Sequence, residues 1–260
     1  MLIRNISSRA WRVWRRDLEV YATTWKTNFL PPLLEPVQYI LAFGVGMGSL
    51  IGTVRYFGVQ MPYLEFMVPG MLAVSIMFWS YFETTYSSFI RMYYQRTFEA
   101  ICTTPLLVED VICGEWLWGA TKSLLAASLM LFAVSFFGLL EWPDALLVLP
   151  IAILGGLLFA ALGLITTALS PSIEVFNVPT FLLIFPMFLF SGTFFPIDVL
   201  PPWARAVATA LPLTHVSMLV RGACLGSTPP GMWVSVAYLV LALPIAAWLA
   251  FRLMKRRLVK

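Results

Sequence analysis

The chain has 260 residues, of which 60% are hydrophobic and only 12% are charged, and its mean hydropathy is +0.85. A soluble domain usually carries about a quarter charged residues, so a soluble chain of this size could not cover so much apolar surface. The same composition excludes a disordered chain. Because about 20 apolar residues cross a bilayer, there is room for roughly six spans, and we expect an all-α polytopic membrane protein.

The charge and the cysteines exclude two further classes of site. The net charge of +4 does not indicate nucleic-acid binding, because the basic residues gather in a few clusters typical of membrane topology signals. The three cysteines form no CxxC pair and the chain has one histidine. We therefore expect neither a metal site nor a haem site.

Residues 1–30 have the pattern of an amphipathic helix. Apolar residues recur at steps of three and four from Ile3 to Phe29, and six basic residues mostly occupy the other face. Such a helix is suited to lie in the headgroup plane on the cytoplasmic side. Pro31 and Pro32 are expected to end it.

Six apolar stretches follow, each long enough to cross a bilayer with some tilt. They cover residues 33–51, 67–89, 117–140, 145–169, 175–195 and 233–251. With six spans, one side of the membrane holds the six basic residues of the N-terminal segment, the two of the loop after the second span and the five of the C-terminal tail. The opposite side has only Arg55, Arg205 and Arg221. This asymmetry predicts that both termini are cytoplasmic.

The outer loop before the last span contains two short apolar pieces. Prolines divide residues 197–225 into Trp203–Leu211 and His215–Leu225, and neither piece is long enough to cross a bilayer. We expect a re-entrant hairpin of two short helices, which is allowed only where protein covers their ends.

Ionisable residues within spans are the usual functional pointers in membrane proteins. Glu83 lies in the second predicted span, and Glu115 and Lys122 lie seven residues apart on one helix face near the start of the third. They are candidates for a polar seam or for the transport pathway. The alternative is interfacial anchoring with local hydrogen bonds.

Motifs for catalysis are weak. The nearest string to a P-loop, Gly114–Ser123, has its lysine two positions too late and enters a predicted span. Ser191 and His215 are the one combination that suggests a nucleophile and a base. The simpler interpretation is that Ser191 permits close helix packing at a span end.

The order of these elements, together with several sequence strings, resembles the ABC-2 permease family, the membrane subunits of type V ATP-binding cassette (ABC) exporters. The strings are most similar to the nodulation-protein-J branch, which is linked to lipo-oligosaccharide export. They are Tyr63–Gly70, Phe82–Phe89, Gln95–Ala100, Glu109–Glu115, Leu189–Pro196 and Leu211–His215.

The resemblance implies a permease subunit that is not itself an enzyme. Two copies of the chain would form the pathway in a bacterial inner membrane, and two copies of a separate ATPase subunit would bind ATP and magnesium. The chain would bind no cofactor of its own. Its partners would be the ATPase, a second copy and the lipid bilayer, and its substrate a lipid-linked saccharide, another amphiphile or a drug.

The resemblance also assigns a coupling helix to the loop after the second span, at about residues 91–104. Its candidate ATPase-coupling residues are Arg91, Gln95, Arg96, Phe98 and Glu99. Phe98 would be a buried anchor in the ATPase surface, or it would dip into the inner leaflet. At the outer loop the gate candidates are Trp203, His215 and Arg221.

Two other functions stay open. An ion-coupled transporter or channel without an ATPase would need an acidic site in the membrane with a partner. A membrane enzyme or assembly factor would need a convergent nucleophile and base. Copurification of an ATPase subunit separates the exporter from both.

The predicted sidedness can be tested by labelling single cysteines in a background without the three native ones. A membrane-impermeant thiol reagent should reach Gln60→Cys and Ser227→Cys from outside sealed cells. It should not reach Thr97→Cys or Arg257→Cys until the membrane is opened. Labelling of position 257 in sealed cells would contradict cytoplasmic termini.

Overall fold

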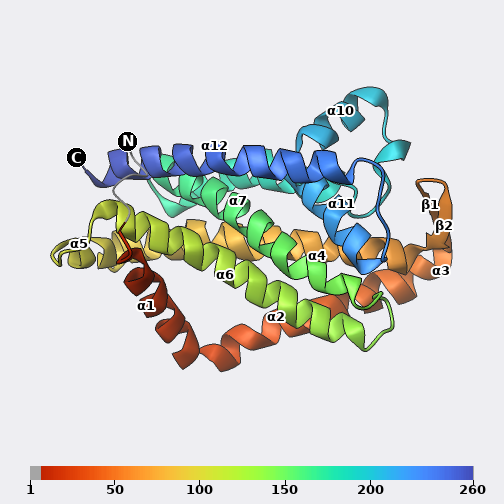
Figure 1. The fold of residues 1–260 in the computed structure, drawn as a ribbon, viewed down its shortest axis with the longest axis horizontal. Helices are drawn as coiled ribbons and strands as arrows, with labels where there is room; N and C mark the ends of the chain where they lie inside the picture. Colours follow the sequence, from red (N-terminus) through yellow and green to blue (C-terminus); the bar gives the residue numbers. More distant parts are fainter. Residues whose placement is uncertain (1–6, 260) are drawn as a thin grey trace.

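The computed structural model describes residues 7–259, which form a bundle of mostly long helices with one small β-hairpin (Figure 1). Five helical runs within this part are long and apolar enough to cross a membrane. They are Tyr63–Tyr94, Val108–Ser135, Asp144–Leu169, Ile173–Phe190 and Met232–Leu258. The chain is thus a polytopic membrane protein, as its composition predicts.

The N-terminal part differs from the prediction in where its helix ends. α1 covers Ala10–Thr23, and α2 (Trp25–Tyr39) follows directly after Thr24. Pro31 and Pro32 lie inside α2, so the expectation that they end the amphipathic helix is wrong. The chain bends at Thr24, and α1 and α2 form a corner that packs against α6 (Figure 1).

The first predicted span, residues 33–51, is helical throughout but is not among the five runs. It continues from α2 through a π-helical segment, Ile40–Met47, into α3 (Gly48–Ile51). The candidate for a sixth span by length and composition is instead the pair α10 (Pro202–Ala210) and α11 (Pro212–Cys224), which is bent by 83°. The two short helices predicted in the outer loop are therefore present.

Span helix 2, as we call the run Tyr63–Tyr94, begins with α4 (Tyr63–Phe82) and lies in the middle of the bundle. α6 (Val108–Ser135), α7 (Val148–Leu169) and α11 pack around α4, and α12 (Met232–Leu258) packs on α7. α6 begins nine residues before the predicted third span. This brings Glu115 inside the helix.

Small residues set the separation of the central helices. A Cβ atom at Gly156 of α7 would lie 1.9 Å from Ser123 Oγ, and one at Gly163 would lie 2.0 Å from Thr84 Oγ1. Ser80 Oγ uses the close approach to donate to Gly156 O at 2.5 Å. Such packing and polar contacts hold membrane helices together, because lipid gives no hydrophobic drive for their association.

One end of the bundle contains a hairpin that the sequence did not predict. β1 (Thr53–Tyr56) pairs antiparallel with β2 (Val59–Pro62), and Tyr56 lies opposite Val59. Phe57 and Gly58 both have positive φ, at 44° and 86°, as a two-residue type I′ turn requires. The predicted helical membrane bundle is present, and this hairpin, whose strands are only four residues long, adds a small β element to it.

The two ends of the bundle differ in what they gather. The start of α1, the short helix α5 (Thr97–Cys102) and the end of α12 lie at one end, and the hairpin lies at the other with α10 and α11 (Figure 1). The remaining elements are the one-turn helices around the fourth and fifth spans and α8 and α9. They are Asp144–Leu147, Ile173–Phe176, Asn177–Pro179, Thr180–Ile184, Phe185–Phe190 and Ile197–Val199.

Candidate functional site

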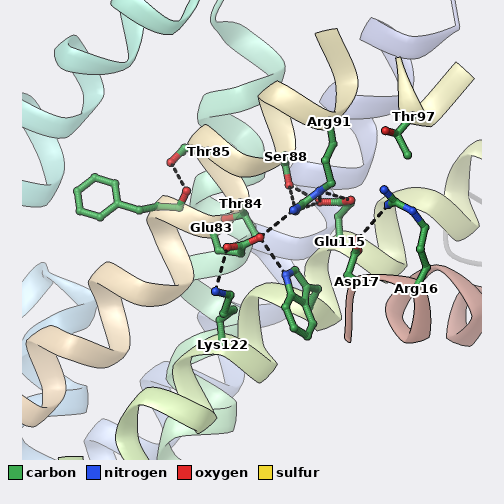
Figure 2. Close-up of polar contacts among 12 residues, drawn as sticks. Arg16, Asp17, Glu83, Thr84, Thr85, Ser88, Arg91, Thr97, Glu115 and Lys122 are labelled. Carbon is green, nitrogen blue, oxygen red and sulfur yellow. Dashed lines mark hydrogen bonds and ion pairs between the residues drawn. The ribbon is translucent and has the colours of Figure 1, made fainter. Parts of the chain in front are cut away.

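A group of charged side chains lies where α1, span helix 2 and α6 meet, and we call it the ion cluster (Figure 2). Its members are Asp17 of α1, Glu83, Ser88 and Arg91 of span helix 2, and Glu115, Trp118 and Lys122 of α6. The three residues that the sequence indicates as a polar seam are thus brought together. Arg91 joins them instead of lying on the cytoplasmic surface.

Arg91 is the centre of the ion cluster. Its Nη1 donates to Glu83 Oε1 at 2.9 Å, and its Nε and Nη2 donate to the Glu115 carboxylate at 3.0 and 2.5 Å. Ser88 Oγ also donates to Glu115. The Arg91 side chain is 14% exposed and that of Glu115 is 1% exposed. A planar guanidinium that holds two carboxylates fixes span helix 2 to α6 in one geometry.

Glu83 connects Arg91 to Lys122. Lys122 Nζ lies 3.7 Å from Glu83 Oε2, and Trp118 Nε1 donates to Glu83 Oε1 at 2.9 Å. Lys122 Nζ also lies 4.5 Å from the centre of the Tyr21 ring of α1, within cation–π range. Two carboxylates and two cations make this part of the cluster neutral, as buried charges require.

Asp17 adds a further buried carboxyl from α1. It lies four residues after Val13 on the buried face of that helix and is 4% exposed. Arg16 Nη1 lies 3.0 Å from Asp17 Oδ1, while Asp17 Oδ2 has no hydrogen-bond partner within residues 7–259. Burial, and after it the nearby Glu115 carboxylate, raises the pKa of Asp17 from 3.8 to about 7.

Two π-helical turns explain how Glu83 and Arg91 both face α6. Residues eight positions apart in a straight α-helix lie about 80° apart around its axis. Span helix 2 contains π turns at Glu83–Ser87 and Ile90–Tyr94, which take up more residues per turn. The rotation between Glu83 and Arg91 is then closer to two full turns, and both side chains face α6. Such turns are frequent at functional sites.

Two cavities adjoin the ion cluster, and Glu83 and Lys122 line both. One has a volume of about 270 Å³ and extends along α1, and the other has about 470 Å³ and extends towards α2. The second is also lined by Glu35 and Trp79, whose indole Nε1 donates to Glu35 Oε2 at 3.1 Å. The cavities therefore combine aromatic rings with charged groups at the corner between α1 and α2.

The predicted coupling helix is shorter than residues 91–104. α5 covers Thr97–Cys102, and Arg96 before it has a positive φ of 51°. Gln95, Arg96 and Glu99 are exposed, so these coupling candidates are open to a partner. Phe98 is 2% exposed and belongs to the hydrophobic core of this chain, because α5 packs against α6. The expectation that Phe98 anchors another surface is therefore wrong.

The coupling segment, as we call residues 95–107, is tied to the N-terminal part and to the start of α6. Asp110 Oδ1 accepts from Ser7 N at 2.7 Å, and Arg9 Nη1 donates to Pro105 O at 2.6 Å. Glu109 pairs with Lys255 of α12 at 2.5 Å. The sequence did not single out these contacts, which join three separate parts of the chain at one end of the bundle.

The three outer gate candidates do not form one group. Trp203 is 72% exposed on α10. His215 stacks on Tyr238 with ring centres 4.0 Å apart, and its ring nitrogens contact Ser235 Oγ and Thr209 O at 3.1 and 3.0 Å. Since Thr209 O only accepts, His215 Nε2 is the donor in that contact. Arg221 lies buried on α11.

The same contacts bear on catalysis. Both ring nitrogens of His215 are engaged, and Ser191 Oγ is buried without a hydrogen-bond partner within residues 7–259. A general base must reach the hydroxyl that it activates. The described part of the chain therefore brings Ser191 and His215 into no nucleophile–base pair.

Comparison with known proteins identifies the family. The sequence profile described as "ABC-2 type transporter" matches residues 9–225, which is most of the chain. The chain belongs to the ABC-2 type transporter family. The matched region runs from α1 to the end of α11 and contains the whole ion cluster and the coupling segment.

Several ABC-2 relatives cover nearly the full length. Nodulation protein J of Rhizobium meliloti is 37% identical over 246 residues, which are 95% of this chain and 92% of that protein. Nodulation protein J of Sinorhizobium fredii is 34% identical over 246 residues with the same coverage. The inner membrane transport permease YadH of Escherichia coli is 25% identical over 215 residues, 82% of each chain. The resemblance to the nodulation-protein-J branch is confirmed.

Replacing Arg91 tests the ion cluster. Arg91→Gln leaves Glu83 and Glu115 buried without their shared guanidinium, and breaking a buried pair in this way costs about 3–5 kcal/mol. The heated, detergent-solubilised protein should lose its monodisperse peak at a clearly lower temperature than the wild type. The control is Arg15→Gln, because Arg15 and its partner Glu19 are 67% and 65% exposed. Equal thermal midpoints for Arg91→Gln and Arg15→Gln would contradict the central role of Arg91.

The raised pKa of Asp17 predicts a pH dependence of stability. The folded state keeps the proton up to about pH 7, whereas the unfolded chain releases it near 3.8. The stability from this group is therefore full below pH 3.8 and is lost as the pH rises through 7. Thermal midpoints of the wild type should fall between pH 5 and pH 8, and those of Asp17→Asn should fall less. The control, Glu19→Gln on the same helix, should follow the wild type.

Proposed function

We propose that this chain is the membrane-spanning permease subunit of an ABC exporter in a bacterial inner membrane. Two copies would form the pathway, and two copies of a separate ATPase subunit would bind and hydrolyse ATP with magnesium. The substrate class is a lipid-linked saccharide, another amphiphile or a drug. The observation that carries the proposal is the family match over residues 9–225. The printed name of one relative, inner membrane transport permease, supports transport and the location.

The proposed topology has both termini in the cytoplasm and α1 as an interfacial helix. The outward face of α1 carries exposed basic residues, such as Arg15, as a helix at anionic headgroups would. The helical run from α2 through α3 would be the first of six spans, and α10 with α11 would be a re-entrant pair. Support comes from the gathering of α1, α5 and the end of α12 at one end of the bundle (Figure 1).

In the proposed mechanism the ATPase binds the coupling segment through Gln95, Arg96 and Glu99. Movement there would reach α1 through the Ser7–Asp110 and Arg9–Pro105 contacts. It would reach the spans through Arg91, which lies four residues before Gln95 and holds both Glu83 and Glu115. The cavities beside the ion cluster would change shape as these elements move.

A specific observation favours the alternative of an ion-coupled transporter without an ATPase. That function needs buried acidic groups with partners, and Glu83, Glu115 and Asp17 are such groups. The two functions differ in their energy source. The exporter is supported if transport by the purified complex requires ATP and continues after the ion gradients are collapsed. The alternative is supported if transport needs no ATP and stops when the gradients are collapsed.

Charge reversal at Glu99 tests the coupling segment. Glu99→Lys changes an exposed side chain outside the spans, so folding and membrane insertion should be unchanged. Loss of a charge contact with the ATPase should lower its copurification by roughly ten- to a hundredfold if the pair is desolvated, which corresponds to about 1.5–3 kcal/mol. Glu174→Lys, exposed in the one-turn helix Ile173–Phe176 after α7, is the matched control. Equal copurification for both variants would place the ATPase contact elsewhere.

A further inference from the structure

Arg221 is a buried cation at the outer end of the bundle, opposite to the ion cluster. The residue is 3% exposed and lies on α11. Its Nε donates to Phe66 O at 3.1 Å, its Nη2 donates to Gly192 O at 2.8 Å, and its Cζ lies 4.0 Å from the centre of the Phe66 ring. Carbonyl dipoles and ring faces stabilise a cation but do not neutralise it.

Arg221 has no carboxylate partner within the part of the chain that the structure describes. The ion pairs found within residues 7–259 do not include Arg221, whereas Arg91 has two carboxylate partners. A buried charge without a partner carries a large desolvation cost. The surroundings of Arg221 therefore favour the arrival of an anion.

A cavity of about 230 Å³ gives an anion access to Arg221, and we call it the outer pocket. Ser191 also lines it, and Ser191 Oγ is a buried hydroxyl without a hydrogen-bond partner within the described residues. Ser191 directly precedes Gly192, whose carbonyl contacts Arg221. A guanidinium and an unsatisfied hydroxyl thus belong to the wall of one cavity.

The other ionisable groups of the outer pocket leave its charge positive. Arg205 and Asp198 line it too, but both are exposed and opposite in sign, and Arg205 donates to Asp198 O. His215, whose ring nitrogens contact Thr209 O and Ser235 Oγ, adds no negative charge. The remaining charge is that of Arg221, and it is the one shielded from water.

We propose that the outer pocket binds a phosphate group, with Arg221 as its counter-charge and Ser191 Oγ as a hydrogen-bond donor. Arginine is the side chain best suited to phosphate, because its planar donors match two oxygens. The volume of about 230 Å³ is several times the roughly 30 Å³ that one water occupies in the liquid. The pocket thus has room for the group that carries the phosphate, and both a lipid headgroup and free phosphate have the required chemistry.

The competing interpretation is that Arg221 only clamps two carbonyls of span helix 2 and the loop after α9. A clamp needs neither the Ser191 hydroxyl nor an anion. Arg221→Gln would not separate the two, because it removes the clamp and the counter-charge together. Ser191→Asp separates them, since it places a carboxylate in the outer pocket and leaves Arg221 and both carbonyls present.

The experiment measures the thermal midpoint of the purified chain in a neutral detergent at constant ionic strength. The probes are inorganic phosphate, a short-chain phosphatidylglycerol, and a diacylglycerol with the same chains but no phosphate. The wild type should be stabilised by one or both phosphate probes and not by diacylglycerol. A response to phosphatidylglycerol alone assigns the pocket to a headgroup, and a response to inorganic phosphate shows that the free anion suffices.

The variants decide whether the stabilisation arises in the outer pocket. Ser191→Asp should abolish it, and Ser191→Ala should raise the apparent Kd about tenfold, the value of one hydrogen bond to a charged group. Arg55→Gln removes an exposed cation from β1 outside the pocket and should respond like the wild type. If Ser191→Asp does not fold, the apparent Kd of Ser191→Ala is compared with that of Arg55→Gln, and this comparison decides. No stabilisation by either phosphate probe, or the same Kd in both Ser191 variants as in the wild type, would overturn the proposal.

Discussion

The half of the bundle that contains the ion cluster depends on one buried guanidinium for its arrangement. Arg91 holds Glu83 of its own helix and Glu115 of α6 at the same time, and Glu83 passes the contact on to Lys122. Removing Arg91 leaves Glu115 buried without its cationic partner, and removing Glu83 leaves Lys122 without its carboxylate. The corner of α1 and α2 packs over the same residues. A motion of the coupling segment, which starts four residues after Arg91, would therefore reach span helix 2 and α6 through one side chain.

Hydrophobic composition was enough to predict the membrane bundle, because apolar runs of this length have no other stable place. It was not enough at the ends of helices. A proline leaves a backbone carbonyl of its helix without a hydrogen bond, and a membrane helix continues through it where another group satisfies that carbonyl. α2 continues through both Pro31 and Pro32. The hairpin was missed because its strands are four residues long and its one strong signal is the turn at Phe57 and Gly58.

The ion cluster was predictable in part. Glu83, Glu115 and Lys122 were visible as charges within apolar runs. Arg91 was assigned to the loop after the second span, because the π turns that extend span helix 2 to Tyr94 leave no periodic signal. Asp17 did carry a signal, as an acid four residues after Val13 on the apolar face of α1. Phe98 shows the opposite error. An apolar residue in a polar loop was assigned to a partner, whereas this chain buries it.

The coupling free energy between Arg91 and Glu115 is the most direct measure of this arrangement. The free energy of unfolding would be compared for the wild type, Arg91→Gln, Glu115→Gln and the double variant in one detergent. Residues that share a buried charge contact have interaction energies of about 0.5–3 kcal/mol. The double variant should be more stable than the two single effects added together predict, by about 2 kcal/mol or more, towards the upper end of that range. Additive effects, within about 0.5 kcal/mol, would show that Arg91 does not hold α6 through Glu115.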